Sequence, residues 1–180
     1  MFIFGHIGIT LGIIFGLGII FPRLKTIINP IFLAIGALLP DLIDKPLGRV
    51  IFAQTIANGR IIGHTLLFFL LILLIGLYLY DKRREIVVLN LAIGSFFHII
   101  EDQMWNTPQT LFWPIFGLSF PKGSPDNAGI RGIIRELIIA LKNTATLHVS
   151  QSYIPEFLGM AIVIILTLHW LIKKRGQNKF

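Results

Sequence analysis

Five apolar runs lie along the chain, at residues 2–21, 27–39, 63–80, 86–104 and 155–172. A helix needs about 20 mostly apolar residues to cross a hydrocarbon core of ~30 Å, because each residue advances it by about 1.5 Å. The run 27–39 is short, so we expect it to be tilted or only partly inserted. The pattern predicts an all-α fold, a polytopic transmembrane helix bundle with about five spans in a single domain over residues 1–180.

Local signals refine two of these runs. No Lys or Arg precedes the run 2–21 and no small-residue cleavage site follows it, which favours a retained span over a signal peptide. Its Gly8, Gly12 and Gly16 either admit the close approach of another helix or are merely tolerated. Asn29-Pro30 suits the start of the second helix, as cap and first-turn residue, and we expect that helix to end at Pro40.

A separate amphipathic helix is predicted at about residues 128–142. Its apolar positions follow the i, i+3, i+4, i+7 spacing, and Arg131, Arg135, Glu136 and Lys142 fall mostly on the other side. Such a helix either lies in the membrane interface or packs over the bundle. The sequence leaves both alternatives open.

Composition agrees with a membrane protein and excludes several other classes. The chain is 54% hydrophobic and only 14% charged, with a mean hydropathy of +0.78. These values exclude an ordinary soluble globule and a disordered chain. The absence of cysteine excludes disulfides, thiol chemistry and zinc fingers. The expected partner is therefore the lipid bilayer, and no nucleic-acid partner is expected despite the net charge of +7.

The basic residues predict an orientation. They cluster after the first, third and fifth runs, at Arg23 and Lys25, at 82–84 and at 173–175. With five spans these places share one side of the membrane, and the positive-inside rule makes that side cytoplasmic. We therefore expect a multi-pass plasma-membrane protein whose N-terminus is extracytoplasmic and whose C-terminus is cytoplasmic.

Polar and ionisable residues gather at the opposite, extracytoplasmic ends of the runs. Such groups are costly in apolar helices and mark functional sites in membrane proteins. They are His6, Asp41, Asp44, His64, His98, Asp102 and Glu156. His98 and Asp102, at i and i+4, share one helix face, and Asp41 and Asp44 lie one turn apart if the chain stays helical after Pro40. Imidazole and carboxylate ligands without thiolate predict a divalent metal, Zn first, with Mn or Mg as alternatives. The alternative is that these residues only close helix ends.

Nearby residues have less defined functions. Arg60 precedes His64 by one turn and suits either a bidentate phosphate contact or a snorkelling side chain at the interface. Glu101 points about 100° away from Asp102 on a helix, so we expect it at most to support a ligand. Trp105 and Trp113 suit an interfacial aromatic belt, and His169 has no predicted function.

Three segments carry a resemblance to a known family. Leu-Leu-Pro-Asp-Leu-Ile-Asp-Lys-Pro at 38–46, Gly-Arg-Ile-Ile-Gly-His-Thr at 59–65 and His-Ile-Ile-Glu-Asp at 98–102, followed by Leu-Phe-Trp-Pro at 111–114, resemble the membrane-bound metal-dependent hydrolases. These are also described as LexA-binding, inner-membrane-associated hydrolases. The resemblance covers about residues 1–117. More distantly, the order Asp, His, His-x-x-x-Asp is similar to zinc-dependent phospholipase C.

The resemblance implies a ligand set and a reaction class. The family's pattern of an early His, a Leu-Pro-Asp segment, an Arg before a His and a later His-x-x-x-Asp falls on His6, Asp41, Asp44, Arg60, His64, His98 and Asp102. The chain departs from it at Gly59, where many members have His, and in the Asp41-x-x-Asp44 spacing. A metal held by His6, Asp41, Asp44, His64, His98 and Asp102 would activate water against a phosphate ester or lipid head group, with Arg60 and Asp44 in the catalytic machinery. The alternative is a metal-binding or transport protein without hydrolytic activity.

Overall fold

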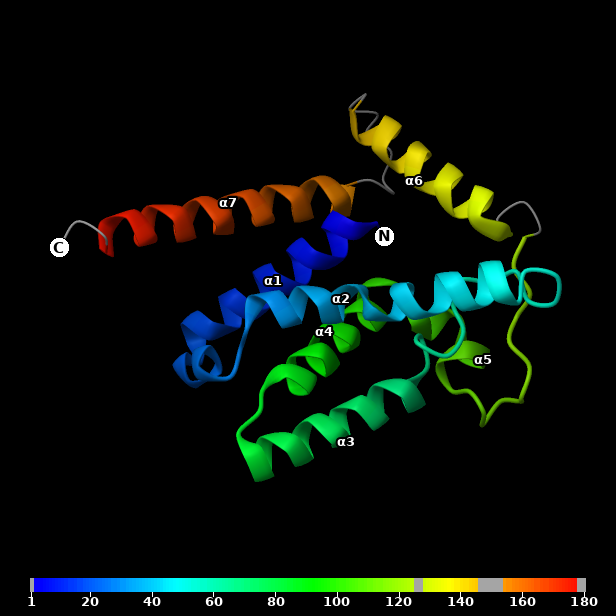
Figure 1. The fold of residues 1–180 in the computed structure, drawn as a ribbon, viewed down its shortest axis with the longest axis horizontal. Helices are drawn as coiled ribbons and strands as arrows, with labels where there is room; N and C mark the ends of the chain where they lie inside the picture. Colours follow the sequence, from blue (N-terminus) through cyan, green and yellow to red (C-terminus); the bar gives the residue numbers. More distant parts are fainter. Residues whose placement is uncertain (1, 125–127, 146–153, 178–180) are drawn as a thin grey trace.

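The computed structural model describes residues 2–124, 128–145 and 154–177, and every regular element in these residues is a helix (Figure 1). The long elements are the α-helices α1 (Ile3–Ile20), α2 (Pro30–Asp44), α3 (Leu66–Arg83), α4 (Val87–Glu101), α6 (Gly129–Ala145) and α7 (Ile154–Gln177). The short ones are the 3₁₀ turns η1 (Pro22–Thr26) and η3 (Met104–Asn106), the π-helix η2 (Lys45–Ile51) and the single turn α5 (Pro108–Leu111). The predicted all-α fold is therefore confirmed for the described residues.

Helices α1, α2 and α4 contact one another and form the centre of the molecule. α3 packs against α4, and α7 packs along α1 (Figure 1). Leu11, Ile14 and Leu33 are buried where α1 and α2 meet, with Ile93 and Phe97 of α4 packed against them. This arrangement sets the first turn of α1 beside the last turns of α2 and α4.

Small residues let α7 approach α1 closely. A Cβ atom at Gly8 would collide with the backbone of Gly159, and one at Gly159 would collide with the backbone of Phe4. A Cβ at Gly12 would press on the side chain of Ile162, whereas Gly16 has open space around it. Close helix packing thus accounts for Gly8 and Gly12, and Gly16 has no such contact.

Helix α2 corrects the prediction that Pro40 ends the second helix. Asn29 caps it as expected, since its Oδ1 accepts from the amides of Ile31 and Phe32, but the helix continues through Pro40 to Asp44. Proline has no N–H to offer the carbonyl of Gly36, four residues earlier. The hydroxyl of Ser95 on α4 donates to that carbonyl instead, at 3.1 Å. The extra turn puts Asp41 and Asp44 on a helix, one turn apart.

Helix length limits how many elements can be assigned to the membrane. Within the described residues, two helices are both long and apolar enough to cross a bilayer, Ile3–Ile20 and Ile154–Arg175. α2 and α4 have 15 residues each, and α3 has 18 but ends in Asp81, Lys82 and Arg83. α2 is extended beyond its 15 residues by η2, which continues directly from it.

Candidate metal centre

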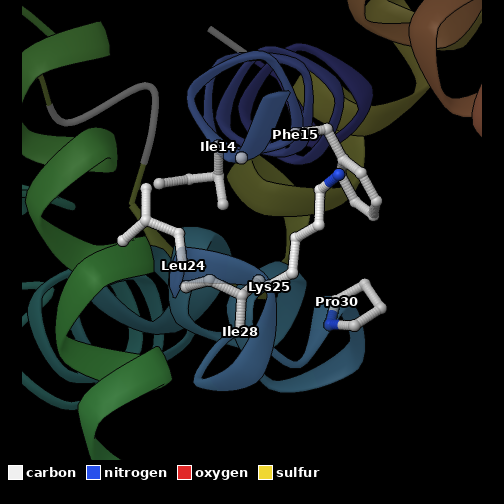
Figure 2. A pocket seen from close by; sticks show the side chains of 7 residues that line it. Ile14, Phe15, Leu24, Lys25, Ile28 and Pro30 are labelled. Carbon is white, nitrogen blue, oxygen red and sulfur yellow. The ribbon is translucent and has the colours of Figure 1, made fainter. Parts of the chain in front are cut away.

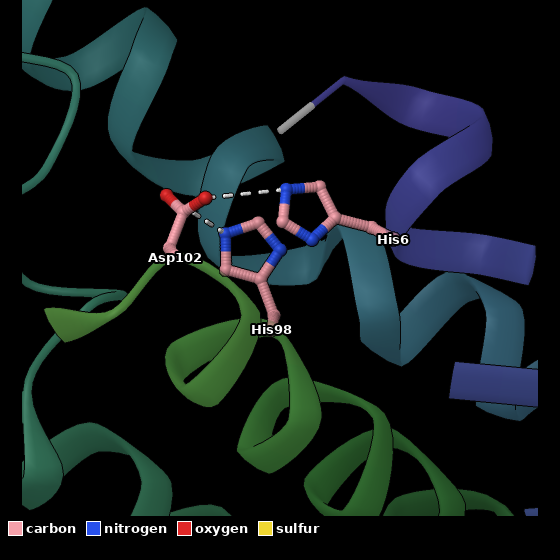
Figure 3. Close-up of side chains that lie close together, drawn as sticks. All are labelled: His6, His98 and Asp102. Atoms are coloured by element: carbon pink, nitrogen blue, oxygen red, sulfur yellow. Dashed lines mark ion pairs between the residues drawn. The ribbon is translucent and has the colours of Figure 1, made fainter. Parts of the chain in front are cut away.

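Four segments that are distant in the sequence bring His and Asp side chains together. His6 is in the first turn of α1, Asp41 in the last turn of α2, and His64 comes two residues before α3. His98 is in the last turn of α4, and Asp102 follows that helix directly. Figure 3 shows His6 and His98 side by side with Asp102 beside both rings. All four elements meet at one end of the bundle, as the sequence predicted.

The five side chains form two overlapping groups that suit a metal ion. His6, His98 and Asp102 form one, and Asp41, His64 and His98 form the other, with the ligand atoms of each group within 4.8 Å of one another. The Nε2 atoms of His64 and His98 are 3.1 Å apart, and Asp102 Oδ2 lies 3.6 Å from the former and 3.9 Å from the latter. An imidazole Nε2 has one lone pair, so His98 can serve only one of the two groups at a time.

Each imidazole is held through its other nitrogen. Nδ1 of His98 lies 2.7 Å from the carbonyl oxygen of Ala37, Nδ1 of His64 lies 2.7 Å from Asp44 Oδ2, and Nδ1 of His6 lies 2.7 Å from Glu101 Oε2. Carbonyl and carboxylate oxygens only accept hydrogen bonds, so each Nδ1 carries the proton. This is the pattern in which metal-binding histidines are oriented by an outer acceptor.

The centre of the cluster consequently consists of acceptors. With Nδ1 protonated, the neutral rings present bare Nε2 lone pairs toward one another and toward the Asp41 and Asp102 oxygens. His6 Nε2 is fully buried and makes no hydrogen bond within the described structure. Two buried Nε2 atoms 3.1 Å apart need either a shared proton or a cation between them. The donor set of imidazole and carboxylate therefore fits a divalent metal ion.

Asp44 occupies a different position from the one predicted for it. Its carboxylate is completely buried and accepts from the amides of Ile61, Gly63 and His64 as well as from the His64 ring. Neither metal-binding group includes it. With both oxygens engaged by four donors, Asp44 is the acceptor that positions His64 and the loop before α3.

Glu101 accepts hydrogen bonds from two side chains of α1. One oxygen accepts from the His6 ring and the other from the hydroxyl of Thr10, at 2.9 Å. The helical angle between Glu101 and Asp102 keeps Glu101 out of the centre, as predicted, but directs it onto the back of His6. The Thr10 contact could have been anticipated only from knowing that α1 lies against α4.

Three basic side chains border the cluster. Lys45 Nζ lies 2.7 Å from Asp41 Oδ2, and Arg60 Nη2 lies 2.8 Å from Asp102 Oδ2. Burial raises the pKa of Asp41, which lies beyond the apolar run 27–39, but the Lys45 ammonium together with the His98 and His64 rings holds the pKa below its ordinary value. The third, Arg49, fills the space beside Gly59, where a Cβ atom would lie 2.7 Å from its Nε. The glycine at position 59, where many members of the resembled family have His, thus leaves room for the Arg49 side chain.

These basic residues line a polar pocket of about 390 Å³ over the cluster. Its charged lining residues are Asp41, Asp102, Lys45, Arg49, Arg60 and Glu136 of α6, which forms an ion pair with Arg49. The Arg60 side chain is 43% exposed, so its guanidinium can contact both Asp102 and a molecule in the pocket.

Glu156, predicted at the same membrane face, does not join the cluster. Its carboxylate accepts from the amides of Phe2, Phe4 and Gly5, and so satisfies the free N–H groups at the start of α1. A carboxylate there is also favourably placed in the field of the helix dipole. Glu156 therefore fixes the turn that presents His6.

A second pocket lies at the opposite end of the bundle. It has a volume of about 210 Å³ and is lined by Ile14, Phe15, Gly18, Leu24, Lys25, Ile28 and Pro30 (Figure 2). This lining is apolar except for Lys25 and includes no metal-ligating side chain. Of these two pockets, the polar one therefore adjoins the clustered His and Asp side chains.

Comparison with known proteins identifies the family. The model of the family described as YdjM inner membrane protein matches residues 1–177. The chain belongs to this family. No curated protein and no solved structure gives a significant match. Membership agrees with the predicted plasma-membrane location and with the lipid bilayer as the surroundings of the chain.

Proposed function

We propose that this chain is a membrane-embedded metal-dependent hydrolase that acts on a phosphate ester or lipid head group. The observation that carries the proposal is the set of three imidazoles, each held through Nδ1, whose Nε2 atoms meet two aspartates beneath a pocket lined by basic residues. Purely structural histidines at helix ends need no such convergence of bare lone pairs. The resemblance to membrane-bound metal-dependent hydrolases supports the same reaction class.

The ligands in this proposal are His6, His64, His98, Asp41 and Asp102, and the ion is Zn, with Mn or Mg as alternatives. A bound divalent ion supplies a water of lowered pKa and polarises a phosphoryl oxygen. Asp44 and Glu101 keep the His64 and His6 rings in the ligating tautomer. Arg60 binds an anionic oxygen of the substrate and stabilises the charge that develops on it.

We also propose that the chain crosses the membrane five times, near residues 2–21, 27–39, 63–80, 86–104 and 155–172. Many large apolar side chains of α3 and α7 are exposed, among them Leu70, Leu74, Ile165 and Leu168, as expected of surfaces in contact with lipid. The basic turn η1 after α1 and the basic ends of α3 and α7 lie on the same side of the molecule, the left in Figure 1, away from the metal centre. This supports the orientation with the centre on the extracytoplasmic face.

The proposal is tested on protein purified in detergent, by measuring metal content and the hydrolysis of phospholipid and simple phosphodiester substrates. His98→Ala should reduce both, whereas Arg60→Lys should keep the metal and lower turnover by about tenfold or more, because a lysine does not reproduce the planar guanidinium. His169→Ala on α7 is the control and should change neither.

Two results would contradict the proposal. Unchanged metal content in His98→Ala would show that the cluster is not the metal site. Full metal occupancy with no hydrolysis over the substrate panel would favour the alternative, a metal-binding or transport protein, which metal flux into liposomes would then identify.

A further inference from the structure

We propose that the substrate is an amphiphile with a phosphate head group, and that one of its acyl chains lies in an apolar groove between α2 and α6. This rests on the proposed function, which leaves open whether the phosphate ester is a lipid. The groove and the polar pocket over the metal centre together match the two ends of such a molecule.

The groove has a volume of about 290 Å³ and adjoins the polar pocket directly. Phe2, Asp41, Lys45 and Glu136 line both cavities. Beyond these shared residues the groove is lined by apolar side chains of α1, α2, η2 and α6, namely Ile3, Leu38, Leu42, Pro46, Ile133 and Leu137. A molecule with its phosphate at Lys45 can therefore extend an apolar tail into the groove, because the two cavities share these lining residues.

The charges of the polar pocket select the head group once a metal is present. Lys45, Arg49 and Arg60 are each paired with a carboxylate, from Asp41, Glu136 and Asp102 respectively. A divalent ion held by Asp41 and Asp102 compensates those two carboxylates, so the charges of Lys45 and Arg60 become available to an anionic oxygen. In addition, Arg49 Nε is buried without a hydrogen-bond partner in the described structure, beside the pocket.

Helix α6 forms the outer wall of the groove. Ile133 and Leu137 line the cavity, and Glu136 between them binds Arg49 of η2. Leu137 is also partly open to the outside, at 46% exposure, and the apolar residues Ile130, Ile134 and Ile138 are exposed without lining the groove. One part of the amphipathic surface thus faces the groove and another faces outward, so an acyl chain entering from the lipid meets apolar surface throughout.

The test compares a ligand that has both a phosphate group and an alkyl chain with ligands that have only one of the two. Metal-loaded protein in dodecyl maltoside micelles is photolabelled with dodecyl phosphate bearing a diazirine near the chain end, and the labelled peptides are mapped. We expect labelling of α2 or α6 near the groove, with efficient competition by dodecyl phosphate and at least tenfold weaker competition by inorganic phosphate or dodecanol.

A matched pair of variants on α6 tests the groove itself. Leu137→Asn should weaken binding of dodecyl phosphate by about tenfold and leave binding of inorganic phosphate and the metal content unchanged. Ile138→Asn, the next residue and not part of the lining, should behave like the unmodified chain. Equal affinities for dodecyl phosphate and inorganic phosphate, or equal effects of the two variants, would overturn the proposal of an acyl groove.

The metal content of the same samples separates this inference from the proposed function. A full complement of metal with no preference for the amphiphile refutes the groove and leaves the hydrolase intact. Failure of the protein to bind any divalent metal refutes the hydrolase, and with it the source of the charge that selects the head group.

Discussion

The Nδ1 atoms of the three clustered histidines find their acceptors on two helices, α4 and α2. Glu101 holds His6 from α4, Asp44 holds His64 from α2, and the Ala37 carbonyl holds His98 from within α2. The ligating residue types and their helix ends could be predicted from the sequence. The acceptors could not, because a backbone carbonyl has no sequence signal and because Asp44 resembles a ligand until its four donors are seen.

The position of Asp44 leads to a prediction at the residue scale. Asp44→Asn replaces one acceptor oxygen by an NH₂ group that would face N–H donors, so the His64 ring and the loop at 61–64 should lose their support. We expect metal affinity to fall by about 10–100-fold, as measured by competition with a chelator. Hydrogen exchange at 61–64 should rise at the same time.

Asp81→Asn provides the control for this prediction, since Asp81 is exposed at the far end of α3. It should leave both measurements unchanged. Metal affinity equal to that of the unmodified chain in Asp44→Asn would mean that the His64 ring does not need this acceptor.

At the scale of single elements, α2 shows why a local rule failed. Proline inside a helix leaves one carbonyl without its amide, and in a sequence read alone that favours a helix end at Pro40. The Ser95 hydroxyl of α4, 59 residues away, satisfies the Gly36 carbonyl, and so the helix continues for the turn that carries Asp41 and Asp44. The boundaries of α1, α3 and α4 agree with the apolar runs to within three residues, because caps such as Thr65 act locally, whereas α7 extends five residues beyond its run.

This arrangement predicts a coupling between Ser95 and Pro40. Ser95→Ala leaves the Gly36 carbonyl buried and unpaired, which should lower the free energy of unfolding by about 1–3 kcal/mol. In a Pro40→Ala background the residue at 40 supplies its own N–H, so the same substitution should cost clearly less. Denaturant unfolding of the four proteins in detergent measures the difference, and equal costs in both backgrounds would contradict the prediction.

At the scale of the whole molecule, the segregation of charge is the main organising feature. The clustered side chains of His6, Asp41, His64, His98 and Asp102 meet at one end of the bundle, and the basic η1, the end of α3 and the end of α7 lie away from it (Figure 1). The family match to inner membrane proteins agrees with a membrane location.

The polarity predicts the labelling pattern of a chain that has no cysteine of its own. A cysteine at Ser119, exposed between α5 and α6, should react with an impermeant thiol reagent added to intact cells. One at Asp81, exposed at the end of α3, should react only after the membrane is opened. The reverse pattern would place the metal centre on the cytoplasmic side and refute the proposed orientation.

The sequence by itself determined the helical class, the membrane setting and the set of residues that form the cluster. These follow from local properties, namely the length and composition of apolar runs and the cost of placing ionisable groups at their ends. Only the tertiary structure decided which of those residues face the centre. The position of Asp102 suits a metal ligand, whereas Asp44 is an acceptor for other groups. Which of the two a carboxylate becomes depends on the donors that packing brings from distant segments. The groove beside α6 likewise exists only where α2 and α6 meet, since it is a property of the space between elements.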